Sequence, residues 1–315
     1  MGRYLLRRLG FAVLLVFVVS SATLLLTRLA PGDTLDPIER ARIVKELGLD
    51  RPLVTQYFSW LGGVLRFDFG RSVLYSRPVG ALISERALNT AVLAIVALIF
   101  ATAIGIPLGI YSGSRTRGFG RSLVRAISVL GLSVPPLVGS LALVFLAART
   151  GWLPVGGMTS ASGLDMTWAQ WLADLARHIP LPALALAIPL AAALERLQSQ
   201  AIAAARRERF VAASEARGLE RTQALLRHAW PVSLRPVLGL YGVMIGSLFS
   251  GSFVVEVVTS WPGLGRLMFD ALKARDLFLV AGCAATGAFF LAIGTLIADL
   301  LLAWTDPRVT AEERG

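Results

Sequence analysis

Long uncharged stretches are the sequence feature that most limits what this chain can fold into. Five stretches of 19 to 28 residues contain no Asp, Glu, Lys or Arg, and a sixth, shorter stretch has 16 residues. A helix rises about 1.5 Å per residue, so about 20 apolar residues are needed to cross about 30 Å of hydrocarbon. We therefore predict six transmembrane helices, at about residues 9–27, 87–111, 126–148, 177–194, 236–255 and 277–298.

The composition supports a membrane protein and excludes an ordinary soluble enzyme. Hydrophobic residues make up 55% of the chain and charged residues only 16%, whereas soluble domains carry about 25% charged residues. Backbone groups in lipid must pair internally, and these continuous apolar runs lack the alternation of barrel strands. The predicted fold class is an all-α membrane protein. Arg3, Arg7 and Arg8 precede the first stretch as in a signal peptide, but its apolar length favours a retained helix.

The distribution of charge predicts how the chain is oriented in the membrane. The N-terminus and segments 115–125, 195–235 and 299–315 together carry a net charge of +9, while the three intervening connections carry +2. Positively charged connections stay in the cytoplasm, so both termini and segment 195–235 are predicted to be cytoplasmic and loop 28–86 external. These assignments predict a single transmembrane domain over 1–315. The total charge of +11 thus reflects membrane orientation and not nucleic-acid binding.

The sequence lacks the residues that several chemical activities require. A P-loop requires lysine after glycine, and neither Lys45 nor Lys273 follows one. No predicted span has a carboxylate at its centre, which disfavours an autonomous ion-coupled carrier. His178 and His228 lie outside the span centres, so no catalytic or metal set is expected, and the lone Cys283 excludes an intrachain disulfide. We predict a non-catalytic chain that holds no cofactor or metal.

The cytoplasmic segment 195–235 has the most informative local pattern. Good helix formers fill its first part, 195–205, and small residues follow in 209–217. Gly218 is placed to end a helix with a sharp turn, and a second short helical stretch, 220–230, leads to Pro231. These features are typical of a compact helix–turn–helix element, and spacing alone leaves a solvated loop and a docking surface equally open.

Segment 209–231 resembles the EAA loop of binding-protein-dependent ABC importer permeases. That pattern has E-A-A, three residues, glycine, nine residues and I-x-L-P. Ala212, Ala213 and Ser214 stand at its first three positions, and the distance from Gly218 to Pro231 matches. Ala212 replaces the glutamate of the pattern. The resemblance implies that the segment docks on ATPase subunits through Phe210, Ala212, Ala213, Ser214, Ala216, Gly218 and Pro231.

The whole chain resembles the B-type permease subunit of dipeptide, oligopeptide or nickel ABC importers. Short matching stretches run almost end to end: 4–8, 31–33, 46–53, 67–72, 106–109, 132–135, 151–154, 256 with 261–265, and 306–308. The resemblance implies a type I ABC importer permease fold, a second homologous permease, two ATPase subunits that bind ATP and Mg, and an extracytoplasmic substrate-binding protein. It also makes Trp261, Pro262 and Gly263 candidates for gate or binding-protein contacts.

Two questions stay open at the level of sequence. The substrate is undetermined among dipeptides, longer peptides, nickel and other solutes. An autonomous carrier or channel is the alternative function, and it predicts transport by the purified chain alone. Small and helix-breaking residues inside the spans, such as Gly105, Pro107 and Gly109, are read as close helix packing in preference to substrate contacts.

Overall fold

The computed structural model describes residues 68–160 and 166–305, together with scattered positions between 10 and 63. The predicted first span, 9–27, most of loop 28–86 and the last ten residues therefore lie outside the described residues. Across the two described ranges every regular element is helical, and the only extended pairing is an isolated bridge between Arg71 and Pro78. The predicted all-α class agrees with this architecture.

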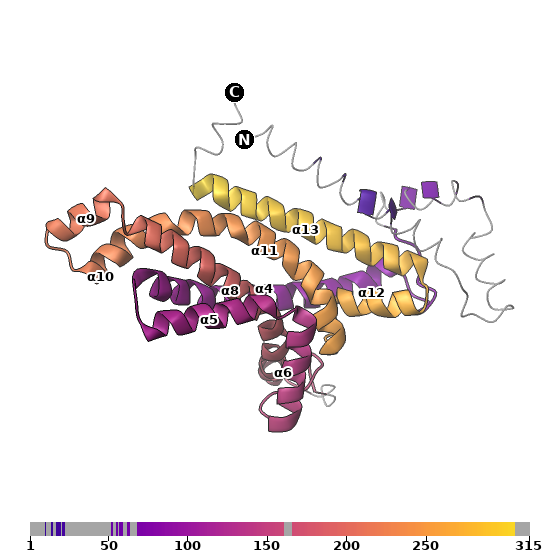
Figure 1. The fold of residues 1–315 in the computed structure, drawn as a ribbon. Coiled ribbons are helices and arrows are strands. Elements are labelled where there is room, and N and C mark those ends of the chain that lie inside the picture. The colour runs from indigo at the N-terminus through magenta and orange to yellow at the C-terminus, as the bar shows by residue number, and fades with distance from the viewer. Residues whose placement is uncertain are drawn as a thin grey trace. The chain divides into compact units, whose positions relative to one another are not determined.

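Most of the helices follow one another with short connections, and the longest connection, residues 151–167, joins α6 to α7 (Figure 1). Four helices in the described ranges are long and apolar enough to cross a membrane: α4, α8, the helical run that contains α11, and α13. The bent pair α5 and α6 makes a fifth if it is counted as one span. The bounds are α4 Val79–Ser114, α5 Phe119–Ser133, α6 Pro136–Thr150, α7 Trp168–His178, α8 Pro180–Ala205, α9 Arg209–Ala216, α10 Arg221–Ala224, the π-helical turn η2 Leu225–Ala229, α11 Trp230–Val258, α12 Leu264–Lys273 and α13 Leu277–Thr305.

The predicted third span, 126–148, is not one continuous helix. The chain bends by 107° between the axes of helices α5 and α6. The break falls at Val134 and Pro135, which both have extended backbone angles. Proline lacks an amide hydrogen and pushes the preceding residue out of the helical region, while Pro136 suits the first turn of the next helix. The double proline therefore divides this apolar stretch in two.

Two other helices begin earlier than the apolar stretches predict. Helix α4 starts at Val79, inside the segment assigned to loop 28–86, and continues to Ser114. Helix α11 starts at Trp230 and continues through Pro231 and Pro236, whereas the predicted span starts at 236. Pro231 lies in the first turn of α11, where its missing amide hydrogen costs little. The π-helical turn η2 directly precedes α11. It contains Arg227, four residues before Pro231, whose carbonyl group a proline ring clashes with in a regular α-helix.

The described chain forms two compact units. The first comprises residues 92–261 and the chain from 293 onward. Its core contains buried side chains from α4, α8 and α11, among them Leu93, Leu186, Leu194, Met244 and Leu248. Glycines on α4 set the spacing to α8: an added Cβ would lie 2.6 Å from the Ala191 carbonyl oxygen at Gly105, 2.6 Å from Gln198 Cβ at Gly109, and 2.3 Å from the Ser199 carbonyl oxygen at Gly113. The close packing expected at Gly105 and Gly109 is confirmed.

The second unit comprises the described residues up to 91 and residues 262–292. Its core joins the start of α4, helix α12 and the start of α13 through Val79, Leu82, Leu267, Leu279 and their neighbours. Asn89 Nδ2 donates to the carbonyl oxygen of Pro262 at 2.8 Å, and the amide of Leu264 donates to Thr90 Oγ1 at 2.8 Å. These two bonds fix the start of α12 beside α4.

Candidate functional site: the helical hairpin after α8

The segment that follows α8 folds as a helix–turn–helix element, as its sequence predicts. Helix α9 ends with two backbone hydrogen bonds that form a Schellman motif: the Gly218 amide donates to the Glu215 carbonyl oxygen at 2.9 Å, and the Leu219 amide to that of Ser214 at 3.2 Å. Gly218 has a φ of +93°, which residues with a Cβ rarely adopt. The predicted turn at Gly218 is confirmed, and its geometry explains why glycine stands there.

A small apolar cluster attaches this hairpin to the long helices. The cluster contains Ile202 and Ala205 at the end of α8, Val211 on α9, Ala224 on α10 and Ala229 in η2, all with 5% exposure or less. Leu219, Leu225 and Trp230 pack around these side chains. In Figure 1, α9 and α10 lie together beyond the ends of α8 and α11. The hairpin is therefore joined to α8 and to the start of α11 by packed side chains, through which a displacement can be transmitted.

The predicted docking residues divide between the surface and the interior of the hairpin. Phe210 is 42% exposed, a large fraction for an aromatic side chain. Ala212, Ala213, Ala216, Gly218 and Pro231 are also exposed. Ser214 is buried and its hydroxyl donates to the Phe210 carbonyl oxygen at 2.8 Å. The hydrogen bond of this side chain is therefore made within α9 and not with a partner protein. The exposed members thus include one aromatic ring and several small side chains, which suit a surface that packs against another protein.

Arg206 connects the hairpin to a third long helix, and sequence reasoning assigned it no role. Its Nη1 atom donates to the carbonyl oxygens of Gly113, at 3.3 Å, and of Ser114. These carbonyls end α4, where helical partners are missing and a positive charge is favoured. Partial burial, followed by the nearby Arg221, lowers the pKa of Arg206 from its ordinary value. The arginine pair at 206–207, just after a helix of small residues, was the available signal.

Glu195 is a second residue whose importance the sequence did not reveal. It appeared to lie at the end of a span, yet its side chain is 1% exposed. Ser112 on α4 donates its hydroxyl to Glu195 Oε1. One helical turn along α8, Gln198 Nε2 donates to Ser233 Oγ of α11 at 2.8 Å. Polar side chains thus cross-link α8 to α4 and to α11 at the end that leads to the hairpin.

The candidate gate residues occupy a tight turn after α11. Trp261 is fully buried and packs among Leu93, Ala97 and Val255. Pro262 is partly buried and Gly263 is buried at the start of α12. The exposed residue of this turn is Ser260, which adopts a φ of +54°. The indole therefore serves as an anchor for the turn.

Chemical groups for a metal site do not gather in the described part of the chain. No set of three or more His, Cys, Asp or Glu side chains in residues 68–160 and 166–305 is placed to hold a metal ion. Within the same ranges Cys283 is buried as a free thiol.

Comparison with known proteins identifies the family to which this architecture belongs. The family described as the binding-protein-dependent transport system inner membrane component matches residues 105–311, and its N-terminal membrane component matches residues 1–94. The chain belongs to this family. It is a multi-pass inner-membrane permease subunit with the type I ABC importer fold.

Curated relatives match over almost the full length of the chain. The oligopeptide transport system permease protein AppB of Bacillus subtilis is 30% identical over 98% of this chain and 99% of its own. The probable peptide ABC transporter permease protein y4tP of Sinorhizobium fredii is 32% identical with the same coverage. A putative peptide transport system permease protein of Brucella abortus, BAB2_1050, is also 32% identical over 98% and 99% of the two chains. The predicted resemblance to peptide ABC importer permeases is confirmed.

Proposed function

We propose that this chain forms one half of the translocation pathway of an ATP-driven importer for di- or oligopeptides. A second, homologous permease forms the other half, two ATPase subunits dock below, and an extracytoplasmic binding protein delivers the substrate. The names of the relatives support peptides as the substrate class. The observation that carries the proposal is the Schellman-ended hairpin, because it presents an exposed Phe210 while Val211 locks it to α8 and α11.

The hairpin converts movement of the ATPase pair into movement of the permease. Phe210 and the exposed alanines of α9 pack against the ATPase surface. The buried cluster around Ile202 passes the displacement to α8 and α11, and Arg206 passes it to α4. Closely packed elements move as rigid bodies between discrete arrangements, so a shift of the hairpin switches the access of the pathway. ATP and Mg belong to the partner subunits, and this chain takes no part in the hydrolysis.

The membrane topology completes the proposal. Six spans with both termini in the cytoplasm place segment 195–235 beside the ATPases and loop 28–86 on the outer side. The turn at Trp261, Pro262 and Gly263 then lies on the outer side as well, where its exposed neighbour Ser260 is placed to meet the binding protein. Cysteines introduced at 260 and at 217 should react with a membrane-impermeant thiol reagent from opposite sides of sealed vesicles. Labelling of both from one side would contradict this topology.

Gly218 offers a sharp test of the coupling role. An added Cβ at Gly218 would meet no atom within 4 Å, so substitutions there act through the backbone angle and not through crowding. Proline cannot adopt a φ of +93°, whereas asparagine tolerates left-handed angles. With the whole importer in liposomes, Gly218→Pro should abolish ATP hydrolysis stimulated by the binding protein, and Gly218→Asn should retain most of it. Normal stimulated ATP hydrolysis in the proline variant would contradict the proposed coupling role of the hairpin.

The same preparation tests the substrate class and the alternative function. Uptake of radiolabelled di- and oligopeptides should require ATP, the ATPase subunits and the binding protein together. Uptake by the purified chain alone would favour an autonomous carrier.

A further inference from the structure

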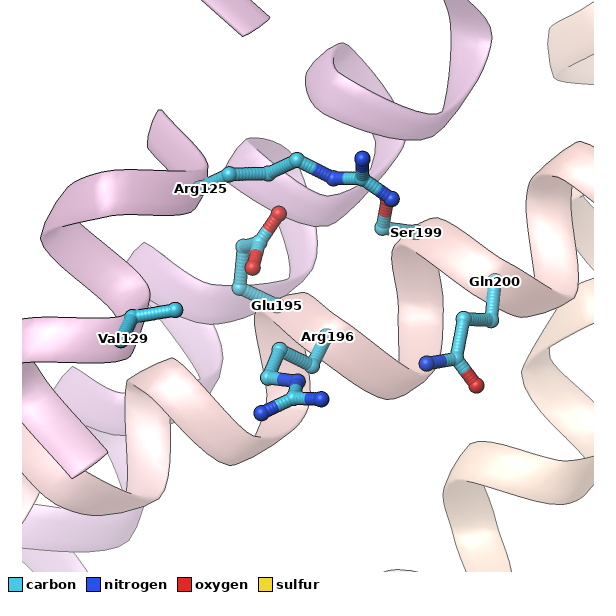
Figure 2. A pocket seen from close by; sticks show the side chains of 6 residues that line it. All are labelled: Arg125, Val129, Glu195, Arg196, Ser199 and Gln200. Carbon is cyan, nitrogen blue, oxygen red and sulfur yellow. The ribbon is translucent and has the colours of Figure 1, made fainter. Parts of the chain in front are cut away.

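A cavity between α5 and α8 holds chemistry that the coupling role does not use. Its volume is about 270 Å³, well above the roughly 30 Å³ that one water occupies in the liquid. Arg125 and Val129 of α5 line one side, and Glu195, Arg196, Ser199 and Gln200 of α8 line the other (Figure 2). All six residues belong to the same compact unit, so the geometry of the cavity is set by the contact of two neighbouring helices.

Glu195 gives the cavity a defined chemical need. The side chain is 1% exposed, and Ser112 satisfies only its Oε1 atom. The Oε2 atom is buried and has no hydrogen-bond partner in the described part of the chain. A buried carboxylate oxygen without a donor is unfavourable, and a charged donor removes the penalty most fully. A strong N–H donor that reaches Oε2 from the cavity, either a ligand ammonium or a guanidinium of the chain, would remove this penalty.

Two arginines line the exposed side of the same cavity, where their positive charge favours an anion. Arg125 and Arg196 are exposed, and each guanidinium presents several donors suited to phosphate oxygens. In Figure 2 the Arg125 side chain extends from α5 towards Ser199, on the side of the cavity where the Glu195 carboxylate lies. In the same view the guanidinium of Arg196 is directed away from that of Arg125. The buried acceptor and the guanidinium of Arg125 fit a ligand that carries an ammonium and an anion a few atoms apart.

We propose that this cavity binds the phosphoethanolamine headgroup of a membrane lipid. The ammonium donates to Glu195 Oε2, and the phosphate oxygens accept from Arg125. Val129 and its exposed neighbours Ile127 and Leu130 provide apolar surface for the attached acyl chains. Basic pockets between transmembrane helices on the cytoplasmic side are known to take lipid headgroups. The assignment to the cytoplasmic leaflet rests on the proposed topology, while the headgroup chemistry does not.

Lipids that differ only in their headgroups test this proposal. The importer is purified with its partner subunits, exchanged into nanodiscs with equal parts of phosphatidylethanolamine, phosphatidylcholine and phosphatidylglycerol of identical acyl chains, and analysed by native mass spectrometry for retained lipid. Phosphatidylcholine keeps the phosphate and positive charge but has no N–H to donate, and phosphatidylglycerol has no cation. We expect phosphatidylethanolamine to be retained about tenfold over either, the factor expected for one hydrogen bond to a charged group.

Matched variants assign the preference to this cavity. Glu195→Gln leaves an amide oxygen to accept from Ser112 and should remove the preference for phosphatidylethanolamine over phosphatidylcholine. Arg125→Gln should lower retention of phosphatidylethanolamine itself. Glu208→Gln and Arg117→Gln change exposed residues outside the cavity and should leave both quantities unchanged. If a cavity variant fails to fold, thermal unfolding of the wild type still decides, since its stability should be higher in phosphatidylethanolamine than in phosphatidylcholine nanodiscs.

Three results would overturn the proposal. The first is equal retention of phosphatidylethanolamine and phosphatidylcholine by the wild type, and the second is an unchanged preference in Glu195→Gln. The third is displacement of the retained lipid by a millimolar dipeptide, because the zwitterion bound at this site would then be the transported solute. Lipid retention is measured without ATP hydrolysis or uptake, so its failure is distinct from a failure of the coupling role.

Discussion

The Nη1 atom of Arg206 lies 3.3 Å from the carbonyl oxygen of Gly113, and this hydrogen bond joins the start of the hairpin to the end of α4. The same nitrogen also donates to the carbonyl oxygen of Ser114. Residues 113 and 206 are brought together because Gly113 lets the backbones of α4 and α8 approach closely. Close packing and a hydrogen bond thus join α8 and α4 at the same place, so a displacement of the hairpin would be passed to α4 through this contact.

Arg206→Met should weaken the link between hydrolysis and transport. Methionine keeps an apolar stem but leaves the last carbonyls of α4 without this donor. The surface of α9 stays intact, so stimulated ATP hydrolysis should persist while peptide uptake per ATP falls by about fivefold, the factor that 1 kcal/mol makes in an equilibrium. Arg207→Met alters the exposed neighbour and is the control. An unchanged ratio of uptake to hydrolysis in Arg206→Met would show that α4 moves without this contact.

Gly109→Ala should destabilise the permease through the contact of α4 with α8. The new Cβ would lie 2.6 Å from Gln198 Cβ and 2.9 Å from the Glu195 carbonyl oxygen, so the helices must separate. Overpacking of this kind costs about 1–3 kcal/mol. Gly239→Ala on α11 meets no atom within 4 Å and should be neutral or stabilising, because alanine favours helix more than glycine. Thermal unfolding of both variants in the same detergent distinguishes crowding from helix propensity, and equal melting temperatures would refute the packing role.

Asp276→Ala should loosen the start of α13. The buried carboxylate accepts from Ser72 Oγ at 2.6 Å, from the Leu74 amide at 3.1 Å and from the Leu279 amide at 3.1 Å. Removing it leaves three donors without their partner and should cost about 3 kcal/mol. Hydrogen exchange at the amides of Leu74 and Leu279 should accelerate together. Acceleration at only one of them would show that the carboxylate does not hold the two segments jointly.

Asp174 predicts an acid-sensitive contact before α8. The Ser160 backbone amide donates to Asp174 Oδ2 at 2.6 Å and its hydroxyl to Oδ1 at 2.8 Å. These bonds, the amide first, lower the pKa of Asp174 below its ordinary value of 3.8. A lowered pKa in the folded state means that the stabilisation is complete above the ordinary value and is lost as the pH falls through the lowered one. Protection of the Ser160 amide from exchange should therefore drop only in strong acid.

Asp174→Asn is the control for this titration. The amide keeps an acceptor oxygen but has no proton to gain, so the acid-dependent loss of protection at Ser160 should disappear. A drop of the same size in this variant would assign the effect to another group.

Much of the fold is legible in the sequence, because lipid imposes strict demands on a spanning segment. The apolar stretches predict helices at residues 87–111, 177–194, 236–255 and 277–298, and the structure has a long helix over most of each. The stretch 177–194 begins in α7, which ends at His178, and continues in α8 from Pro180. The turn at Gly218 was equally legible, since few residues other than glycine accept its backbone angle. Helix ends were less predictable: α4 begins at Val79, among charged residues, because its first turn packs against α12 and α13.

The break between α5 and α6 shows a local signal that hydropathy conceals. An apolar window over 126–148 contains Pro135 and Pro136, yet its mean hydropathy is that of a continuous span. The bend follows from the missing amide hydrogens and the extended angles that proline imposes on the residue before it. The effect of the two prolines on the direction of the chain required the structure.

By itself, the sequence of this protein determined where the chain is apolar, which side of the membrane its charges favour, and where its backbone must turn. Tertiary structure decided which distant groups meet: Arg206 with the end of α4, Ser72 with Asp276, and Glu195 with Ser112 at the edge of a cavity. The physical reason is that hydropathy and backbone angles are properties of one segment. Burial, hydrogen bonding and close approach depend on two segments, and they exist only when packing has placed both.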